Sequence, residues 1–535
     1  PHAPNSIRTW MLAFSTRTFM TSTFRATVFS SLSSLGLLVV AAPALAQEPA
    51  PAAPAETPPA EAPAAVEPAA APEAAPAPAP EPEPAPAPAA VVVVEEPVVE
   101  KAPEPVAPAA EPEPSLSPLK IGTSSFSRFE FRENYDELGV VPAGNAARAR
   151  FSEGDTTVFR ARLTFQTAEL DLAGIKGSIY FAPQASGSWG TSGTGGTIGE
   201  ANVGIYEGYF KLAGDQVAFK AGRFAMNYGD ALVIGNLDWH QAGRAFDGAM
   251  VSVKAGKANI DAFVTQTAQG WPTQGKPFLG GDAFFWGAYA ALGPAIAENF
   301  DLDFYALGKS WGAANTSVDD GAGGTVTTHQ DAATFVTLGA RAKQKIGVFD
   351  YRAEAGVQVG KTQAAAGDAL KKLAYQGDLE LGVAPVKAFR IALGALFASG
   401  NSPDSADKDE AYDELYPTTH KWMGQMDIIG TRTNVMSALV KAQINFTESF
   451  GLNVEGDLFI RPEAGGLGRV DNDTATPGVQ NDNNYAGFLV NAGLAKKWGK
   501  AAQVRGLYGI FVPGKDHYAS NESAHYLEIE AGLRF

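Results

Sequence analysis

Arginine side chains recur where the chain alternates between polar and apolar residues. The stretch FRARLTF, for example, sets Arg160 and Arg162 opposite Phe159 and Leu163. A guanidinium group stays charged at any physiological pH and binds planar anions through paired hydrogen bonds. Arginines on one face of a sheet therefore predict a surface that binds carboxylates or related anions. Strand alternation gives these inward candidates: Arg128, Arg132, Arg160, Arg162, Arg352, Arg390, Arg461 and Arg505.

Acidic residues fall on the same predicted face. They are Glu130, Glu354, Asp378, Glu380, Glu455, Asp457, Glu528 and Glu530. Two interpretations are therefore open. The arginines bind an anionic solute, or they pair with these acids as a network across the wall and have no role toward a solute.

Catalytic chemistry has little support in the sequence. The chain has no cysteine, which excludes thiol nucleophiles and Cys-ligated metals. It contains no GxSxG, HExxH, GxGxxG or GxxxxGK[ST] motif. His420 beside Lys421, with Asp413 near, is better explained as a polar loop contact. The acidic loop 471–484 lacks the glycine and glutamate of an EF-hand, since Thr476 and Asp482 hold those places. We predict no catalytic residue, no metal site and no cofactor.

Charge is distributed unevenly along the 535 residues, whose net charge is -17. Such an acidic balance argues against nucleic acid as the main partner.

No stretch reaches the roughly 18 apolar residues of a membrane-spanning helix. The longest is LGLLVVAAPALA at 35–46. A helical membrane protein is therefore excluded.

The first 46 residues have the features of a secretory signal peptide. Met20 is the expected initiator, followed by an arginine, an apolar stretch and the small-x-small ending Ala44-Leu45-Ala46. We expect cleavage after Ala46 and a mature protein outside the cytoplasm.

Residues 47–118 are built almost wholly from Pro, Ala, Glu and Val. They contain 22 prolines and 13 glutamates against one lysine. Such a segment cannot bury a core and is expected to be a disordered, extended linker in the periplasm. A ligand for a proline-binding domain or for the cell-wall layer is the other possibility.

From 119 to 535 the apolar residues recur at every second position. FDYRAEAGVQV, for example, alternates Phe349, Tyr351 and Ala353 with Asp350 and Arg352. Segments of about ten residues with this period match tilted transmembrane β-strands. The predicted fold is all-β, a transmembrane antiparallel barrel in the outer membrane of a Gram-negative-type cell.

Loop lengths support the same fold, because they alternate between long and short along the chain. Short periplasmic turns and long outer loops, with an even strand count, are typical of outer-membrane barrels. Eighteen strands are predicted, near 120–132, 158–167, 176–184, 204–212, 217–224, 248–254, 259–266, 284–292, 300–308, 334–342, 349–359, 374–383, 389–398, 435–445, 451–461, 485–495, 502–512 and 525–535.

The final strand, HYLEIEAGLRF, is amphipathic and ends on Phe535. It resembles the terminal signal that the barrel-assembly machinery reads in outer-membrane proteins. The alternative is an ordinary edge strand.

Two stretches carry motifs that are more specific than strand alternation. The first, within 222–253, contains Gly222-Arg223, Tyr228-Gly229-Asp230, Asp238-Trp239 and Gly243-Arg244-x-Phe246-Asp247-Gly248; the second, within 412–430, contains Leu415-Tyr416-Pro417-Thr418 and His420-Lys421-Trp422. Both resemble the alginate export family of outer-membrane porins, and the resemblance covers roughly 119–535. It implies an eighteen-stranded barrel. Phe224 stands where the family usually has Gln after the Gly-Arg pair.

The resemblance also implies a function, a porin that passively conducts an anionic polysaccharide such as alginate or a related acidic solute. It places Arg223 and Arg244 in the path as part of a cationic constriction. A polyuronate carries one carboxylate per sugar, which suits fixed arginines. The expected partners are the outer-membrane bilayer, the assembly machinery and the acidic polymer or small anions. A general or anion-selective small-solute porin, a plugged adhesive or structural barrel and, more distantly, a barrel-embedded hydrolase are the alternatives.

Overall fold

The computed structural model describes residues 119–135, 138, 154–190, 200–268, 282–297, 299–319, 325–364, 367–402, 407–463, 484–515, 517–518 and 520–535. The predicted signal peptide and linker, at 1–46 and 47–118, lie outside these residues. The acidic loop 471–484 lies outside them too, apart from its last residue.

Alternating residues in the described ranges form eighteen long strands that close into a barrel. Each strand pairs antiparallel with the next along the chain, and β22 pairs with β1. The strands are β1 (Lys120–Glu133), β2 (Gly154–Gln166), β4 (Ile175–Gly190), β5 (Glu200–Ala213), β6 (Val217–Phe224), β7 (Phe246–Ala255), β8 (Ala258–Ala268), β9 (Ala283–Ala291), β10 (Phe300–Trp311), β13 (Ala333–Ile346), β14 (Phe349–Thr362), β15 (Leu370–Val386), β16 (Phe389–Ala398), β18 (Val435–Thr447), β19 (Phe450–Ile460), β20 (Tyr485–Trp498), β21 (Ala502–Pro513) and β22 (Ala524–Arg534).

The predicted fold is confirmed, and each predicted strand has its counterpart. Bounds differ by a few residues, most at β4, which continues to Gly190 instead of ending near 184. Shorter elements decorate the barrel: β3 (Leu170–Leu172), the hairpin of β11 (Ala314–Asp319) and β12 (Thr325–Gln330), β17 (Lys408–Asp409), the helix α2 (Gly293–Ile296) and the 3-10 turn η2 (Thr419–Lys421).

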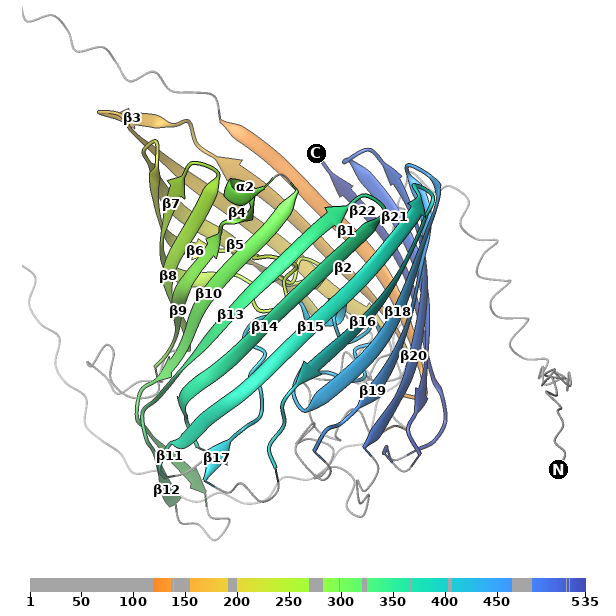
Figure 1. The fold of residues 1–535 in the computed structure, drawn as a ribbon. Coiled ribbons are helices and arrows are strands. Elements are labelled where there is room, and N and C mark those ends of the chain that lie inside the picture. The colour runs from red at the N-terminus through yellow and green to blue at the C-terminus, as the bar shows by residue number, and fades with distance from the viewer. Residues whose placement is uncertain are drawn as a thin grey trace, which may run out of the picture. The chain divides into compact units, whose positions relative to one another are not determined.

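Short turns gather at one end of the barrel and long connections at the other (Figure 1). The turns between β7 and β8 and between β13 and β14 have two residues each. They begin with Gly256 and Gly347, at φ 62° and 61°. Tight hairpins of this kind need positive φ, which glycine adopts without a Cβ clash. The chain enters β1 and leaves β22 at the short-turn end.

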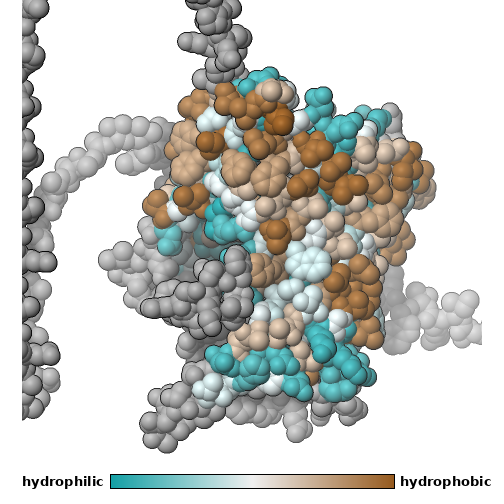
Figure 2. Space-filling model, turned by 90° about the vertical axis from the view of Figure 1, so that its left-hand side faces the viewer, coloured by the Kyte–Doolittle hydropathy of each residue, from teal (hydrophilic) through white to brown (hydrophobic). Residues whose placement is uncertain are grey.

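The barrel exposes apolar side chains on its outer surface and buries charged ones inside, the reverse of a soluble protein. On β15, Leu381 is 55% exposed whereas Asp378 is 5% exposed. Figure 2 shows apolar residues over much of the middle of the side that carries β7 to β9, with polar residues gathered at its lower end. A closed barrel satisfies its backbone hydrogen bonds internally, so such a wall is stable in hydrocarbon.

No helix among the described residues is long and apolar enough to cross a membrane.

Candidate functional site

Two long connections turn back into the barrel (Figure 1). They are residues 225–245, between β6 and β7, and residues 410–434, between β16 and β18. Backbone hydrogen bonds pair them with each other. The amide of Gly235 donates to the carbonyl of Tyr416 at 2.7 Å, and the amide of Tyr416 donates to the carbonyl of Val233 at 3.0 Å. We call 225–245 the first inner segment, 410–434 the second, and both together the inner body.

Apolar side chains pack the inner body against the barrel wall in two clusters. Burial of apolar surface stabilises such contacts by about 25 cal/mol per Å². One cluster joins the first segment to strands β6 to β13 and includes Phe224, Met226, Val233, Ile234, Phe246, Phe285 and Leu415. The other joins the second segment to the opposite wall and includes Tyr412, Trp422, Met426, Ile428, Leu489 and Phe511. The inner body is therefore a packed part of the fold.

Arginines predicted on β1 and β2 hold the tip of the first inner segment. Nη1 of Arg128 donates to the carbonyl of Trp239 at 2.8 Å, and Nη1 of Arg160 donates to that of Asp238 at 2.8 Å. The Asp238 carboxylate lies 3.1 Å from Nη2 of Arg160 and 3.1 Å from Nη1 of Arg162. All three guanidinium groups thus face inward and bind the protein's own chain.

The predicted acids pair with arginines along the same wall. Nε of Arg128 lies 2.6 Å from one oxygen of Glu130, and Nη2 of Arg132 lies 2.6 Å from the other. Arg505 on β21 pairs with Glu528 on β22. In this region the interpretation as a structural network holds, because each of these guanidinium groups has a carboxylate from the wall.

A second network crosses β14 to β18. Nη2 of Arg352 lies 2.7 Å from Asp378, and Nη2 of Arg390 lies 2.8 Å from one oxygen of Glu380. Nζ of Lys441 lies 3.4 Å from the other Glu380 oxygen. The side chains of Arg390 and Lys441 are each 24% exposed. This network therefore meets the solvent of the lumen and is open to exchange of its partners.

Two further predicted arginines bind backbone carbonyls. Nη1 of Arg244 donates to the carbonyl of Pro417 at 2.8 Å and to that of Gly235 at 3.2 Å. Nη1 of Arg461 donates to the carbonyl of Asn434 at 3.4 Å. Arg244 is inside the barrel, as the motif implied, and it joins the two inner segments.

Arg223 lies on the outer face of β6. The next residue, Phe224, is fully buried in the apolar cluster, and strand alternation turns its neighbour the other way. Nη1 of Arg223 is 2.8 Å from Asp247, with the two side chains 44% and 58% exposed. Lys220 shares the inward face with Phe224, since its Nζ lies 5.1 Å from the Phe224 ring. Arg223 has the opposite parity on the same strand, so the prediction that it lines the lumen is wrong.

Other motif residues contact each other across the inner body. The rings of Trp239 and His420 stack with centroids 3.7 Å apart. Nζ of Lys421 donates to the carbonyl of Asp230 at 2.9 Å. The two motif-bearing stretches, far apart in the sequence, thus meet. The sequence marked the motifs without indicating that they touch.

Gly243 illustrates why one motif position is a glycine. Its φ is +69°, and a Cβ there would lie 2.7 Å from Cε2 of Tyr206 and 3.2 Å from Nη2 of Arg162. Any larger residue would displace the segment from the arginine that holds it. The motif glycine serves close packing at this point.

Arg341 of β13 is a central contact that the sequence reading missed. Its Nη2 donates to Oδ2 of Asp230 at 2.6 Å, and its Nη1 to Asp303 at 2.9 Å. Nζ of Lys343 donates to Oδ1 of Asp230 at 2.9 Å. Burial of Asp230 opposes ionisation, but the hydrogen bonds from Lys343 and Arg341 outweigh it and lower the pKa of this carboxyl.

Strand alternation could have found Arg341, since it shares a face with the buried Phe335 and Thr337. Arg432, in contrast, lies in the second inner segment and is 1% exposed, with its guanidinium 5.6 Å from the Tyr412 ring. No periodic pattern covers that loop, so no sequence signal marked it.

His420, Lys421 and Asp413, the residues considered for acid–base chemistry, do not form one site. Nδ1 of His420 lies 3.0 Å from Asp427, whereas Asp413 accepts from Nζ of Lys309 at 2.7 Å. Within the described ranges, no three His, Cys, Asp or Glu residues lie close enough to hold a metal ion.

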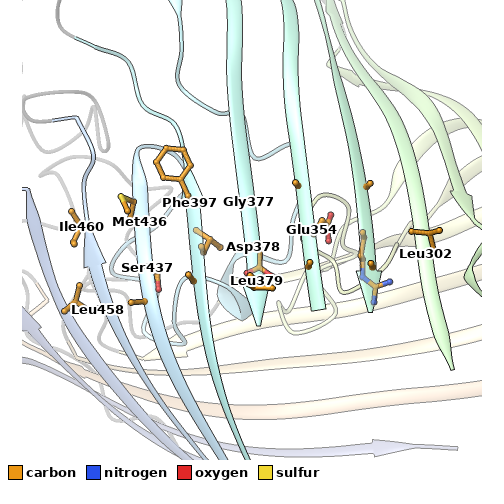
Figure 3. A pocket seen from close by; sticks show the side chains of 18 residues that line it. Leu302, Glu354, Gly377, Asp378, Leu379, Phe397, Met436, Ser437, Leu458 and Ile460 are labelled. Atoms are coloured by element: carbon orange, nitrogen blue, oxygen red, sulfur yellow. The ribbon is translucent and has the colours of Figure 1, made fainter. Parts of the chain in front are cut away.

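A hollow of about 580 Å³ lies in the outer face of the wall across β13 to β19 (Figure 3). Leu379, Phe397, Met436 and Leu458 line it, over small residues such as Gly377. Its lining is mostly apolar and lies on the membrane-facing side, although Glu354, Asp378 and Ser437 also border it. It therefore belongs to the hydrophobic surface rather than to a path for polar solutes.

Known proteins share this architecture. The crystal structure of OccK5 (OpdH) from Pseudomonas aeruginosa matches with 8% identity and a TM-score of 0.50, over 78% of this chain and 99% of that one. OccK1 (OpdK) of the same organism matches with 12% identity and a TM-score of 0.50, over 78% and 98%. No curated protein sequence matches. The family model described as alginate export matches residues 200–525, which hold both motif stretches and the inner body. The chain therefore belongs to the alginate export family.

Proposed function

We propose that this outer-membrane barrel channel conducts an acidic polysaccharide, such as alginate, past the inner body. Family membership makes the chain a transport protein rather than an enzyme. Passage is passive, by diffusion or by the push of synthesis behind the polymer. The linker 47–118 extends into the periplasm in this proposal, and the barrel-assembly machinery inserts the barrel.

One observation carries the choice of substrate, namely the rows of inward arginines. An extended polyuronate presents carboxylates at regular spacing. Each carboxylate can replace a wall carboxylate in the partly exposed network around Arg390 and Lys441, so no guanidinium loses its partner during passage. Exchange between equivalent anions allows binding that is favourable and still reversible, which conduction requires.

The net charge of the chain does not oppose this proposal. At about 0.15 M salt the screening length is ~8 Å, comparable with the radius of a narrow pore. A permeating solute therefore senses the charges that line its path, and the acids of the outer loops contribute little.

A second candidate is a porin for small anionic solutes. The packed inner body favours it, because two apolar clusters fix segments inside the lumen and narrow the path. If the inner body leaves no continuous path, the chain is a plugged barrel with an adhesive or structural role.

The test uses purified protein in planar bilayers. Anion preference is expected, as is stronger current block by polyuronate oligomers than by neutral oligosaccharides of equal length. Changing Arg390 and Lys441 to Gln should weaken both effects several-fold, most clearly at low salt. Arg223→Gln is the matched control, since that arginine lies outside the lumen, and it should leave both unchanged.

Three results contradict the proposal. Conduction of monomeric acids without binding of oligomers would favour the small-solute porin. Cation preference, with equal block by acidic and neutral sugars, would remove the role of the arginines altogether. Absence of conductance in folded protein would favour the plugged barrel.

A further inference from the structure

A cavity of about 630 Å³ lies on the inner side of the wall between β1, β2, β21 and β22, against the tip of the first inner segment. It sits toward the short-turn end, where β22 ends and the turn 499–501 begins. Its volume falls within the ~300–1,000 Å³ of small-ligand pockets. The cations in its lining are Arg160, Lys497, Lys500, Arg505 and Arg534.

Positive charge exceeds negative charge in this cavity, unlike deeper in the lumen. Only Asp238 and Glu530 supply carboxylates among its lining residues. The Arg534 side chain is 68% exposed and reaches Asp238 at only 3.8 Å. Lys497 and Lys500 are exposed and form no ion pair within the described part of the chain. Three cations at this end are therefore available to an incoming anion.

Buried donors in the same lining also lack acceptors. Arg160 is 3% exposed, yet its Nε has no hydrogen-bond acceptor within the described residues. The same holds for Nε of Arg505 and for the indole Nε1 of Trp239. A buried N–H without an acceptor is unfavourable, so three of them in the lining of one cavity favour a bound molecule that supplies oxygen atoms.

We propose that this cavity is a binding site for one carboxylated sugar unit, at which an acidic polymer first engages the channel. Lys497, Lys500 and Arg534 receive the carboxylate. The deeper N–H groups of Trp239, Arg160 and Arg505 donate to hydroxyl and ring oxygens. Short turns lie on the periplasmic side of outer-membrane barrels, so the site faces polymer that arrives from the periplasm.

This inference rests on the proposed function and adds the side and the residues of first contact. Charge alone would attract any anion. The buried donors behind the cations select a larger ligand that has both a carboxylate and hydroxyls, since a small anion held at the lysines leaves them unsatisfied.

The experiment measures block of channel current by trigalacturonate added to one side only. An epitope tag ahead of β1 reports which side carries the short turns. On that side, trigalacturonate should block at a concentration at least tenfold lower than maltotriose. From the long-loop side the difference should be smaller. Phosphate at the same ionic strength should not relieve the block by trigalacturonate.

Two variants test the residues. The double variant Lys497→Gln with Arg534→Gln should raise the half-blocking concentration about tenfold. Trp239→Phe keeps the aromatic ring against His420 and removes one donor, so it should raise that concentration about threefold. Lys257→Gln, in the short turn before β8, removes one positive charge away from the cavity and should have no effect.

Equal block from both sides, relief by phosphate, or an equal effect of Lys257→Gln would overturn this inference while leaving anion conduction intact. Loss of anion preference in the unmodified channel would instead refute the proposed function. Heat-modifiable migration of each variant confirms that it has folded.

Discussion

At the scale of single residues, arginine has two roles in this barrel. Most inward arginines hold the inner body or pair with wall acids, as Arg162 does with Asp238. A smaller group of arginines near the short-turn end has N–H groups without acceptors, as in Arg160 and Arg505, or an exposed guanidinium, as in Arg534. An inward position alone therefore does not make an arginine of this lumen a solute contact.

Asp230 connects the first inner segment to β13, and its charge should control how firmly that segment is held. Attraction by Lys343 and Arg341 lowers its pKa, so the stabilisation is fully present above the unfolded value of about 3.9 and is lost as the pH falls through the folded pKa. Current through the channel should be quiet at pH 7 and should fluctuate only when the pH falls well below the ordinary aspartate pKa, toward the lowered pKa of Asp230.

Asp230→Asn should show those fluctuations already at pH 7, with a stability loss of about 1–3 kcal/mol, because it leaves buried Arg341 with one acceptor fewer. Asp247→Asn is the control, since its pair with Arg223 is exposed and contributes less than about 1 kcal/mol. An Asp230→Asn channel as quiet as the unmodified one would contradict the role of this carboxylate.

Gly243→Ala tests the close packing of a motif glycine. The new Cβ would lie 2.7 Å from the Tyr206 ring, and the alanine would have to keep a φ of +69°. A loss of about 2–4 kcal/mol in the free energy of unfolding is therefore expected. Gly256→Ala has a similar φ of +62° but open space around it, and should cost only about 1 kcal/mol. Unfolding temperatures from heat-modifiable gels compare the two. Equal losses would show that backbone strain alone explains this glycine.

At the scale of elements, the last strand, β22, closes the barrel by pairing with β1, and Phe535 extends that pairing by one residue. The amide of Phe535 donates to the carbonyl of Thr123 at 3.0 Å, and the amide of Thr123 donates to the carbonyl of Phe535 at 3.1 Å. The Phe535 side chain is 75% exposed on this edge. In the proposal that the assembly machinery reads this strand, the exposed aromatic side chain is the group that it contacts before closure.

Deletion of Phe535 should therefore leave secretion intact and reduce the amount of folded barrel in the outer membrane several-fold. Phe535→Tyr keeps the aromatic ring and the terminal hydrogen bonds, and should assemble normally. Heat-modifiable protein in outer-membrane fractions is the measurement. Normal levels of the truncated barrel would show that the strand is an ordinary edge.

At the scale of the whole molecule, the acidic linker and the barrel are expected to be independent. The linker contributes 13 of the chain's glutamates, and its composition cannot bury a core. Removing 47–118 should preserve assembly, unfolding temperature and single-channel conductance. A barrel that fails to fold, or that conducts differently, would show that the linker templates or occupies the pore.

The sequence by itself determined the barrel. Alternation with period two specifies which face of each strand is apolar, and loop lengths specify the order of long and short connections. Both are local properties, so eighteen strands and the inward position of arginines such as Arg128, Arg160 and Arg352 could be predicted without coordinates.

Only the tertiary structure decided what the inward residues do. The inner body forms because Gly235 and Tyr416, far apart in the chain, meet inside the barrel, and contacts at such separation leave no periodic trace in sequence. The face of Arg223 was undetermined because Lys220 has the opposite parity on the same strand, and packing of Phe224 resolved it. Whether an arginine binds a solute or its own wall depends on which acids and carbonyls the closed barrel places beside it.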